Sequence, residues 1–347
     1  MGPLAWSCFL TALGLGTFMT MSSYHWLMAW MGLEINTFAI IPLMALNHHP
    51  RAVEATTKYF LIQAAAAALI LFSSINNAWI TGEWDITNLT NPLSILLMTI
   101  ALSIKLGLAP FHFWLPEVLQ GATLTCGMIL TTWQKLAPMS LMFSIAPNLH
   151  SPLLMTLATL SIMLGGWGGI NQTQTRKILA YSSIAHLGWM IAVVSINPPL
   201  TFFNLVIYIL MTTSMFLTFM ILSSTSISSL TFSWTKTPII LTLASLTLLS
   251  MGGLPPLSGF LPKLIVLMEL IQQSSLATAS LMIMSALLSL FFYVRLLYFL
   301  TLTTYPNFSS SSPWWRTKPL TNTLLLSIFL VSSSLLLPTL QSLINLF

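Results

Sequence analysis

Apolar residues run along this chain in long blocks that short polar segments interrupt. A helix needs about 20 mostly apolar residues to cross the hydrocarbon core of a bilayer. Blocks of that length predict about eleven spans, near residues 3–22, 25–46, 56–80, 91–120, 124–145, 149–171, 178–195, 200–222, 237–270, 276–301 and 323–345. The pattern therefore predicts an all-α polytopic membrane protein.

Two of these spans are too long for a single crossing and contain helix breakers. The breakers are Pro110 and Pro116 in span 91–120, and Gly252, Gly253, Pro255, Pro256, Gly259 and Pro262 in span 237–270. Proline in a helix interior removes a hydrogen bond and clashes with the preceding turn. Backbone freed in this way is tolerated at membrane depth where it is buried in protein or lines a cavity. We expect both spans to be broken helices.

The two interrupted spans are fourth and ninth in the series, so they take equivalent places if the chain holds two five-helix units. Units with an odd number of helices enter the membrane in opposite directions, as in the inverted repeats of secondary transporters. We expect one membrane domain over 1–347, with the first repeat at 1–148, the second at 149–301, and a connector with a C-terminal helix at 302–347.

Composition excludes a water-soluble fold, because 56% of the residues are apolar and only 5% are charged, against roughly 25% charged in an ordinary soluble domain. Cys8 and Cys126 form no CxxC pair, and no cluster has metal-ligand spacing. We therefore expect no disulfide, metal or redox-cofactor site in this chain. The longest basic run is Arg176-Lys177, so nucleic acid is not an expected partner.

If successive predicted spans cross the membrane in opposite directions, the charged residues of the loops separate by sign between its two sides. Basic residues fall on the side of the N-terminus, and acidic residues fall on the other side. The basic set is Arg51, Lys58, Arg176, Lys177, Lys236, Arg316 and Lys318, and the acidic set is Glu83, Asp85 and Glu269. By the positive-inside rule the N-terminus lies in the negative compartment, and an odd span count places the C-terminus opposite.

Four ionisable side chains fall inside predicted spans and away from their ends: Glu34, Lys105, Lys135 and Lys263. Inserting a charged residue at the centre of a membrane-spanning helix costs at least about 2.5 kcal/mol of free energy. The structural alternative is a pair of salt bridges between helices. One carboxylate cannot neutralise three lysines, which favours a functional role.

Burial in a medium of low dielectric constant lowers the pKa of a lysine, and a nearby carboxylate raises it again. A lysine at membrane depth is thus a proton site that responds to neighbouring charge. A change of two pKa units is about 2.7 kcal/mol, which matches the roughly 2.3 kcal/mol needed to move one charge against 100 mV. Proton translocation by electrostatic coupling is therefore the predicted chemistry.

Two histidines inside predicted spans are further candidates for the same path. His112 lies in the first break, seven residues after Lys105, and His186 follows Ser182 and Ser183 by one turn. Histidine titrates near neutral pH and can pass protons. The alternative for each is a core histidine whose hydrogen bonds are satisfied, and the sequence leaves both interpretations open.

Five segments carry a resemblance to a known family: WMGLEIN, KLGLAPFHFWLPE, WQKLAP, RKILAYSSIAHLG and GGLPPLSGFLPK. Together they cover most of the chain, which resembles the antiporter-like membrane subunits of respiratory NADH:quinone oxidoreductase, complex I. The resemblance implies one of three related proton-pumping modules. It also implies that Glu34 and Lys105 are the paired residues, Lys135 the central connecting lysine and Lys263 the exit-side lysine.

The same resemblance implies a location and partners. The location is the mitochondrial inner membrane, with the N-terminus on the matrix side and the C-terminus on the intermembrane-space side. The partners are the other membrane-arm subunits, neighbouring antiporter-like subunits included, and membrane lipids, with cardiolipin as a candidate. NADH, FMN, iron–sulfur clusters and ubiquinone belong to other subunits, and no cofactor or metal is expected in this chain.

The sequence departs from the family pattern in two places. Bacterial relatives have fourteen spans, and this chain lacks the first three, as is typical of animal mitochondrial versions. Thr123 and Thr125 replace prolines that are common after the first break, which puts the geometry of the following half-helix in doubt.

Three rival functions remain open at this point. A stand-alone cation/proton antiporter would share the inverted repeat, although three buried bases and one acid suit bare Na⁺ poorly, since Na⁺ prefers oxygen ligands. A non-pumping assembly scaffold would tolerate loss of Lys135. Direct quinone reduction is the third, and the sequence shows no redox-cofactor site that would support it.

Overall fold

The computed structural model describes residues 2–46, 49–231, 238–301 and 323–335. Within these ranges every regular element is a helix, and the only extended pairings are two isolated bridges, His25 with Asp85 and Gln174 with Ser226. Lys236, Arg316 and Lys318, which the sequence places on the N-terminal side, lie outside the described residues. So do the whole of the predicted connector at 302–322 and the end of the predicted C-terminal helix.

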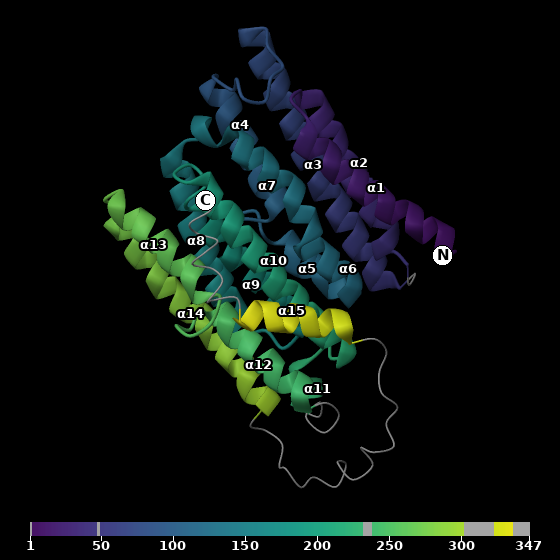
Figure 1. The fold of residues 1–347 in the computed structure, drawn as a ribbon. Coiled ribbons are helices and arrows are strands. Elements are labelled where there is room, and N and C mark those ends of the chain that lie inside the picture. The colour runs from purple at the N-terminus through teal and green to yellow at the C-terminus, as the bar shows by residue number, and fades with distance from the viewer. Residues whose placement is uncertain (1, 47–48, 232–237, 302–322, 336–347) are drawn as a thin grey trace. The chain divides into compact units, whose positions relative to one another are not determined.

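Six described helices are long and apolar enough to cross a bilayer: α1 (Pro3–Ser22), α2 (Trp26–Met44), α3 (Pro50–Thr81), α8 (Ser151–Ile170), α10 (Pro198–Ile221) and α14 (Leu276–Thr301). Shorter apolar helices accompany them, among them α4 (Pro92–Leu106), α12 (Pro238–Gly252) and α15 (Leu324–Leu335). The chain is an all-helical polytopic membrane protein, as the hydropathy pattern predicts (Figure 1).

The two predicted interruptions are confirmed. The fourth predicted span is α4 followed by the short helix α5 (Trp114–Gly121), and the ninth is α12 followed by α13 (Phe260–Gln272). The fifth predicted span is also divided, into α6 (Leu124–Thr131) and α7 (Trp133–Ile145). At this joint the Thr132 hydroxyl donates to the Met128 carbonyl at 2.6 Å. A side chain that bonds the preceding turn in this way competes with the backbone ladder and bends helices.

The chain forms two compact units, residues 1–161 with 194–198, and residues 162–193 with 199–347. In the first unit α1 packs on α2, α2 on α3, and α3 on both α4 and α5. The α1–α2 contact is close, since a Cβ atom at Gly16 would lie 2.5 Å from the Asn36 side-chain oxygen. Small residues allow such close helix crossings in membrane proteins. This unit contains Glu34, Lys105, His112 and Lys135.

The second unit contains the latter half of α8, α9 (Thr175–Ile191), α10, α11 (Ile227–Thr231) and α12 to α15. Glycines of α8 lie against two neighbours: Gly165 and Gly168 against α9, and Gly166 and Gly169 against α14. A side chain at any of these positions would meet its neighbour at 3.0 Å or less. The second unit contains His186 and Lys263.

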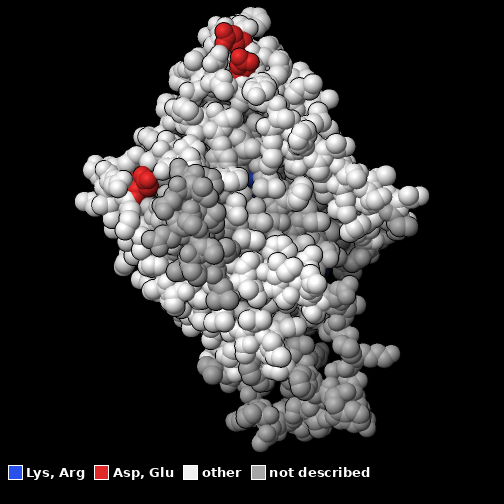
Figure 2. Space-filling view, viewed as in Figure 1, with Lys and Arg blue, Asp and Glu red and all other residues white. Residues whose placement is uncertain are grey.

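The surface agrees with a membrane environment. Figure 2 shows a face almost without charged side chains. Large apolar side chains stand fully or largely exposed on several helices, among them Phe18 at 70%, Trp79 at 88% and Trp167 at 70%. A soluble surface would place charged groups there.

Candidate functional site

A cavity of about 20 Å³ lies inside the first unit, between α2, α3, α4, α5, α6 and α7. Its polar lining consists of Thr37, Tyr59, Gln63, Lys105, Gln134 and Lys135. A cavity needs about 10–15 Å³ of such space and two to four polar partners to hold a water molecule. The two buried lysines therefore share a space that fits one water molecule.

Lys105 reaches this cavity from the last turn of α4. The residue is 6% exposed, and its Nζ atom has no hydrogen-bond partner within the described ranges. The helix ends immediately afterwards, because Gly107 takes the left-handed conformation at φ 76°. The Gly107 amide donates to the Ile104 carbonyl and the Leu108 amide to the Ser103 carbonyl, which is a Schellman cap. The break thus fixes the lysine beside the cavity.

Glu34 is partly buried on α2, beside the cavity lining. Its side-chain oxygen Oε2 accepts a hydrogen bond of 3.0 Å from the Thr37 hydroxyl, and Thr37 itself lines the cavity. Glu34 is therefore one hydrogen bond away from the cavity wall, and among the described residues it forms no direct ion pair with Lys105.

Lys135 enters the cavity from the first turn of α7 and is 4% exposed. Its neighbour Gln134 also lines the cavity, and the Gln134 amide nitrogen donates to the Asn36 carbonyl on α2 at 3.3 Å. Pro138, inside α7, completes this part of the lining. The segment WQKLAP thus supplies an amine, an amide and a rigid apolar wall to one site.

His112 lies in the turn between α4 and α5 and is 4% exposed. Its ring centroid is 4.4 Å from that of Phe113. His112 is not part of the cavity lining. Its buried state agrees equally with a core histidine and with a proton-transfer group, so the sequence alternatives persist.

Lys263, in the first turn of α13, has a different environment. Its Nζ atom donates to the Met251 carbonyl at 3.1 Å and to the Gly252 carbonyl at 3.0 Å. These are the last carbonyls of α12, which has no later turn to bond them. The ammonium group therefore caps the negative end of the helix that precedes the break.

His186, on α9, is 8% exposed and lies beside two tyrosines of the second unit. Its Nε2 atom is 3.4 Å from the hydroxyl oxygen of Tyr293 on α14. The ring of Tyr208 on α10 lies 5.7 Å from the imidazole, centroid to centroid. Both tyrosines are 2% exposed.

Sequence reasoning missed several of these polar partners, namely Thr37, Tyr59, Gln63, Gln134, Tyr208 and Tyr293. One signal was available for Gln63, an amide followed by five alanines in an otherwise apolar span. The tyrosines and Thr37 gave no such signal, because these residue types occur throughout membrane helices. Within the described ranges no group of three or more His, Cys, Asp or Glu residues could hold a metal ion.

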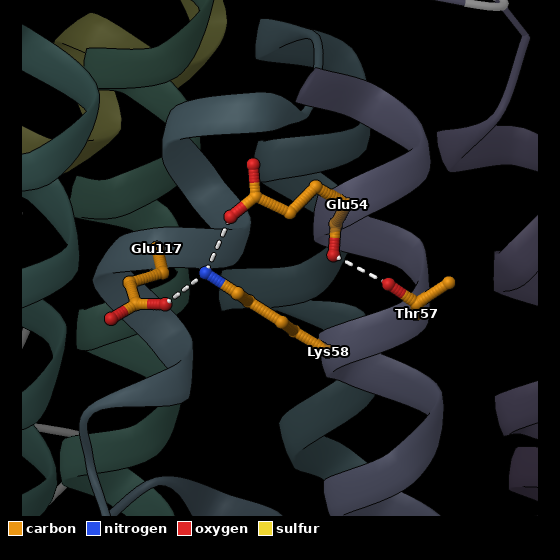
Figure 3. Close-up of polar contacts among 4 residues, drawn as sticks. All are labelled: Glu54, Thr57, Lys58 and Glu117. Atoms are coloured by element: carbon orange, nitrogen blue, oxygen red, sulfur yellow. Dashed lines mark hydrogen bonds and ion pairs between the residues drawn. The ribbon is translucent and has the colours of Figure 1, made fainter. Parts of the chain in front are cut away.

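An exposed ion cluster joins α3 to α5 at the first break (Figure 3). The Lys58 ammonium lies 2.6 Å from the Glu54 carboxylate and 2.7 Å from the Glu117 carboxylate. Glu117 stands in the first turn of α5. The cluster ties the half-helix after the break to the long helix beside it.

Residues 23–289 match the family described as NADH:quinone oxidoreductase/Mrp antiporter, transmembrane. The chain belongs to this family. Residues 290–344 match the family described as NADH dehydrogenase subunit 2 C-terminus. The resemblance drawn from the two breaks and their lysines is therefore confirmed.

Relatives match over nearly the full length. NADH-ubiquinone oxidoreductase chain 2 of Xenopus laevis is 61% identical over 338 residues, covering 97% of this chain and 98% of the relative. The same protein of Formosania lacustris is 55% identical over 347 residues, covering 100% of each chain.

Solved structures agree in fold. A chain of respiratory complex I from Thermus thermophilus, solved with bound aureothin, superposes with a TM-score of 0.82 at 26% identity, over 97% of this chain and 80% of that one. A chain of the Mrp complex from Dietzia superposes with a TM-score of 0.76 at 16% identity, over 85% of this chain and 60% of that one, which is a likeness of fold.

Proposed function

We propose that this chain is a proton-translocating subunit in the membrane arm of complex I, and that Glu34, Lys105 and Lys135 carry protons through its first unit. The observation that carries the proposal is the shared cavity: two buried lysines border a space for one water molecule, and Thr37 of the same lining is hydrogen-bonded to Glu34. A water molecule there would connect the two amines, and a change at Glu34 would alter how tightly Lys105 holds its proton.

Lys263, His112 and His186 complete the proposed set of proton-path residues. Lys263 and His186 serve the second unit, and His112 lies at the first break. The chain itself holds no redox cofactor or metal in this proposal. NADH oxidation, with FMN and iron–sulfur clusters, and ubiquinone reduction take place in partner subunits. The chain is driven by charge changes that those partners impose on Glu34.

The architecture proposed for this activity has about eleven transmembrane helices in two inverted five-helix repeats within one membrane domain. Identical Schellman caps at Gly107 and Gly253 support the repeat, because both broken helices end in the same backbone motif. The proposed location is the mitochondrial inner membrane, with the N-terminus on the matrix side. The proposed partners are neighbouring membrane-arm subunits and lipids, with cardiolipin as a candidate.

The test compares two lysines that lie in opposite environments. Lys105→Met and Lys58→Met make the same chemical change, one beside the cavity and one in the exposed ion cluster. In assembled complex in sealed vesicles, Lys105→Met should lower coupled NADH:ubiquinone turnover about tenfold or more, since a positioned proton-transfer group contributes roughly 10²–10⁴ in rate. Lys58→Met should leave proton transport near that of the unaltered complex.

Normal numbers of protons per NADH in assembled Lys105→Met complex would refute the proposal and favour the scaffold function. Sodium transport by the purified chain in liposomes without electron flow would instead favour a stand-alone antiporter. Quinone reduction by the isolated chain would contradict the assignment of redox chemistry to its partners.

A further inference from the structure

Three buried polar groups that border the lysine cavity make no hydrogen bond within the described ranges. They are the Lys105 side-chain nitrogen, the Tyr59 hydroxyl and the Gln63 amide, and their residues are 6%, 2% and 4% exposed. Burying such a group without a partner costs free energy, and buried water molecules commonly supply the missing hydrogen bonds. The cavity therefore offers an ordered water molecule polar partners as well as space.

Tyr59 and Gln63 reach the cavity from α3. They are four residues apart, so they lie one above the other on the same face of that helix. The Tyr59 ring packs edge-on against the Trp114 indole, with the ring centroids 5.8 Å apart. Trp114 in turn donates from its indole nitrogen to the Ile104 carbonyl, next to Lys105 in the last turn of α4. The first break thus holds the tyrosine ring and the lysine at one cavity.

We propose that Tyr59 and Gln63 hold the water molecule through which protons pass between Lys105 and Lys135, with the Tyr59 hydroxyl as its donor and the Gln63 carbonyl as its acceptor. The proposal rests on the proposed function, in which both lysines belong to the proton path. It assigns Tyr59 and Gln63 as positioning residues, since both act through the water.

The two roles follow from the hydrogen bonds that a water molecule can make. It has two protons to donate and two lone pairs that accept. A charged lysine only donates, so it occupies one lone pair, and the neutral lysine opposite accepts one proton. One lone pair and one proton of the water remain. An amide carbonyl only accepts and a tyrosine hydroxyl can donate, so Gln63 takes the remaining proton and Tyr59 the remaining lone pair.

The transfer step balances without another reactant. When a proton passes from Lys105 to Lys135, the N–H bond at Lys105 breaks as an O–H bond forms on the water. A different O–H bond of the water breaks as an N–H bond forms at Lys135. The water is regenerated, and one positive charge has moved between the lysines. The hydrogen bonds to Tyr59 and Gln63 are the same before and after, so these residues hold the water whichever lysine carries the proton.

The first experiment removes the Tyr59 hydroxyl in assembled complex in sealed vesicles. Tyr59→Phe keeps the ring and its packing, and should lower NADH-driven proton transport about two- to tenfold, as expected for the loss of one hydrogen bond. The solvent deuterium isotope effect on transport should rise, because proton transfer through a poorly held water is slower relative to the other steps. Tyr298→Phe is the control, the same change at a residue of α14 that is 52% exposed, and should change neither quantity.

The second variant, Gln63→Met, keeps the length of the side chain and removes its amide. It should lower transport and raise the isotope effect in the same way. The double variant should lose less than the product of the two single effects, because both residues bind one water molecule. A packing defect alone would lower the unfolding temperature and leave the isotope effect unchanged. Unchanged isotope effects in both single variants would overturn the proposal.

A high-resolution map of the assembled complex tests the same assignment without a variant. An ordered water oxygen should lie about 2.5–3.0 Å from both the Tyr59 hydroxyl oxygen and the Gln63 carbonyl oxygen. A dry cavity, an anion in place of the water, or a water bonded to neither residue would contradict the proposal.

Lys105→Met is measured in parallel to separate the two proposals. If it pumps normally, the proposed function fails. If it loses proton transport while Tyr59→Phe and Gln63→Met keep normal transport and a normal isotope effect, the proposed function stands and the assignment of Tyr59 and Gln63 alone fails.

Discussion

The two broken helices have the same backbone ending and different side-chain caps. After α4 and after α12 the chain continues as Gly-Leu, with the glycine left-handed at φ 76° and φ 84°. In both, the glycine amide bonds the carbonyl three residues back, and the leucine amide bonds the carbonyl five residues back. The remaining carbonyls are satisfied differently. At the first break the Trp114 indole donates to the Ile104 carbonyl at 3.1 Å, whereas at the second the Lys263 ammonium serves this purpose.

This difference decides what each lysine is available to do. A neutral indole caps the first helix end, and the Lys105 amine faces the cavity, whose lining residue Thr37 is hydrogen-bonded to Glu34. The Lys263 ammonium instead donates to two carbonyls at the C-terminal end of α12. One backbone motif is therefore followed by a lysine that lines a cavity in the first unit and by a lysine that bonds helix carbonyls in the second.

The largest effect is expected from a glycine in the second break. A Cβ atom at Gly259 would overlap the Ser250 carbonyl oxygen, which is backbone and cannot move aside. Gly259→Ala should destabilise the second unit by about 3 kcal/mol, the upper end of typical overpacking costs, and lower the yield of assembled complex. Gly252→Ala is the control, because its Cβ atom would have nothing nearer than 3.9 Å. A normal yield of assembled complex for Gly259→Ala would contradict the close approach of Gly259 to the Ser250 backbone.

The second prediction compares how replacing Lys263 and replacing Lys105 changes the stability of the folded chain. Lys263→Met removes two charge-assisted hydrogen bonds from α12 and should cost about 2 kcal/mol. Lys105→Met removes a buried amine that makes no hydrogen bond within the described ranges, so stability should stay the same or rise. The measurement is the temperature at which each assembled complex unfolds. An equal fall in unfolding temperature for both variants would contradict the conclusion that Lys263 caps a helix end and Lys105 does not.

The smallest effect concerns the ion cluster that anchors α5 in the first break. Lys58→Met breaks both contacts to Glu54 and Glu117, whose side chains are 61% and 52% exposed. Exposed ion pairs are worth about 0–1 kcal/mol and are screened by salt. The unfolding temperature should fall slightly at low ionic strength, and the difference should vanish in high salt. A large fall in unfolding temperature that does not depend on salt would show that the cluster contributes more to stability than exposed ion pairs do.

Much of the fold could be predicted from local signals. Long apolar blocks predicted the helices, because hydrocarbon admits backbone only when its polar groups bond internally. The Gly-Leu sequences at 107–108 and 253–254, each followed within two residues by proline, marked both breaks. The joint between α6 and α7 escaped prediction, since threonine side chains bend some helices and leave others straight.

The sequence by itself determined that the chain lies in a membrane and where its helices break, and it predicted four ionisable groups away from the ends of its spans. Those properties follow from composition and from the local chemistry of glycine and proline. Only the tertiary structure decided that Lys105 and Lys135 line one cavity, that Lys263 caps α12, and that Tyr293 faces His186. The partners in each case come from different helices, and the distances between helices depend on side-chain packing that no periodicity along one segment specifies.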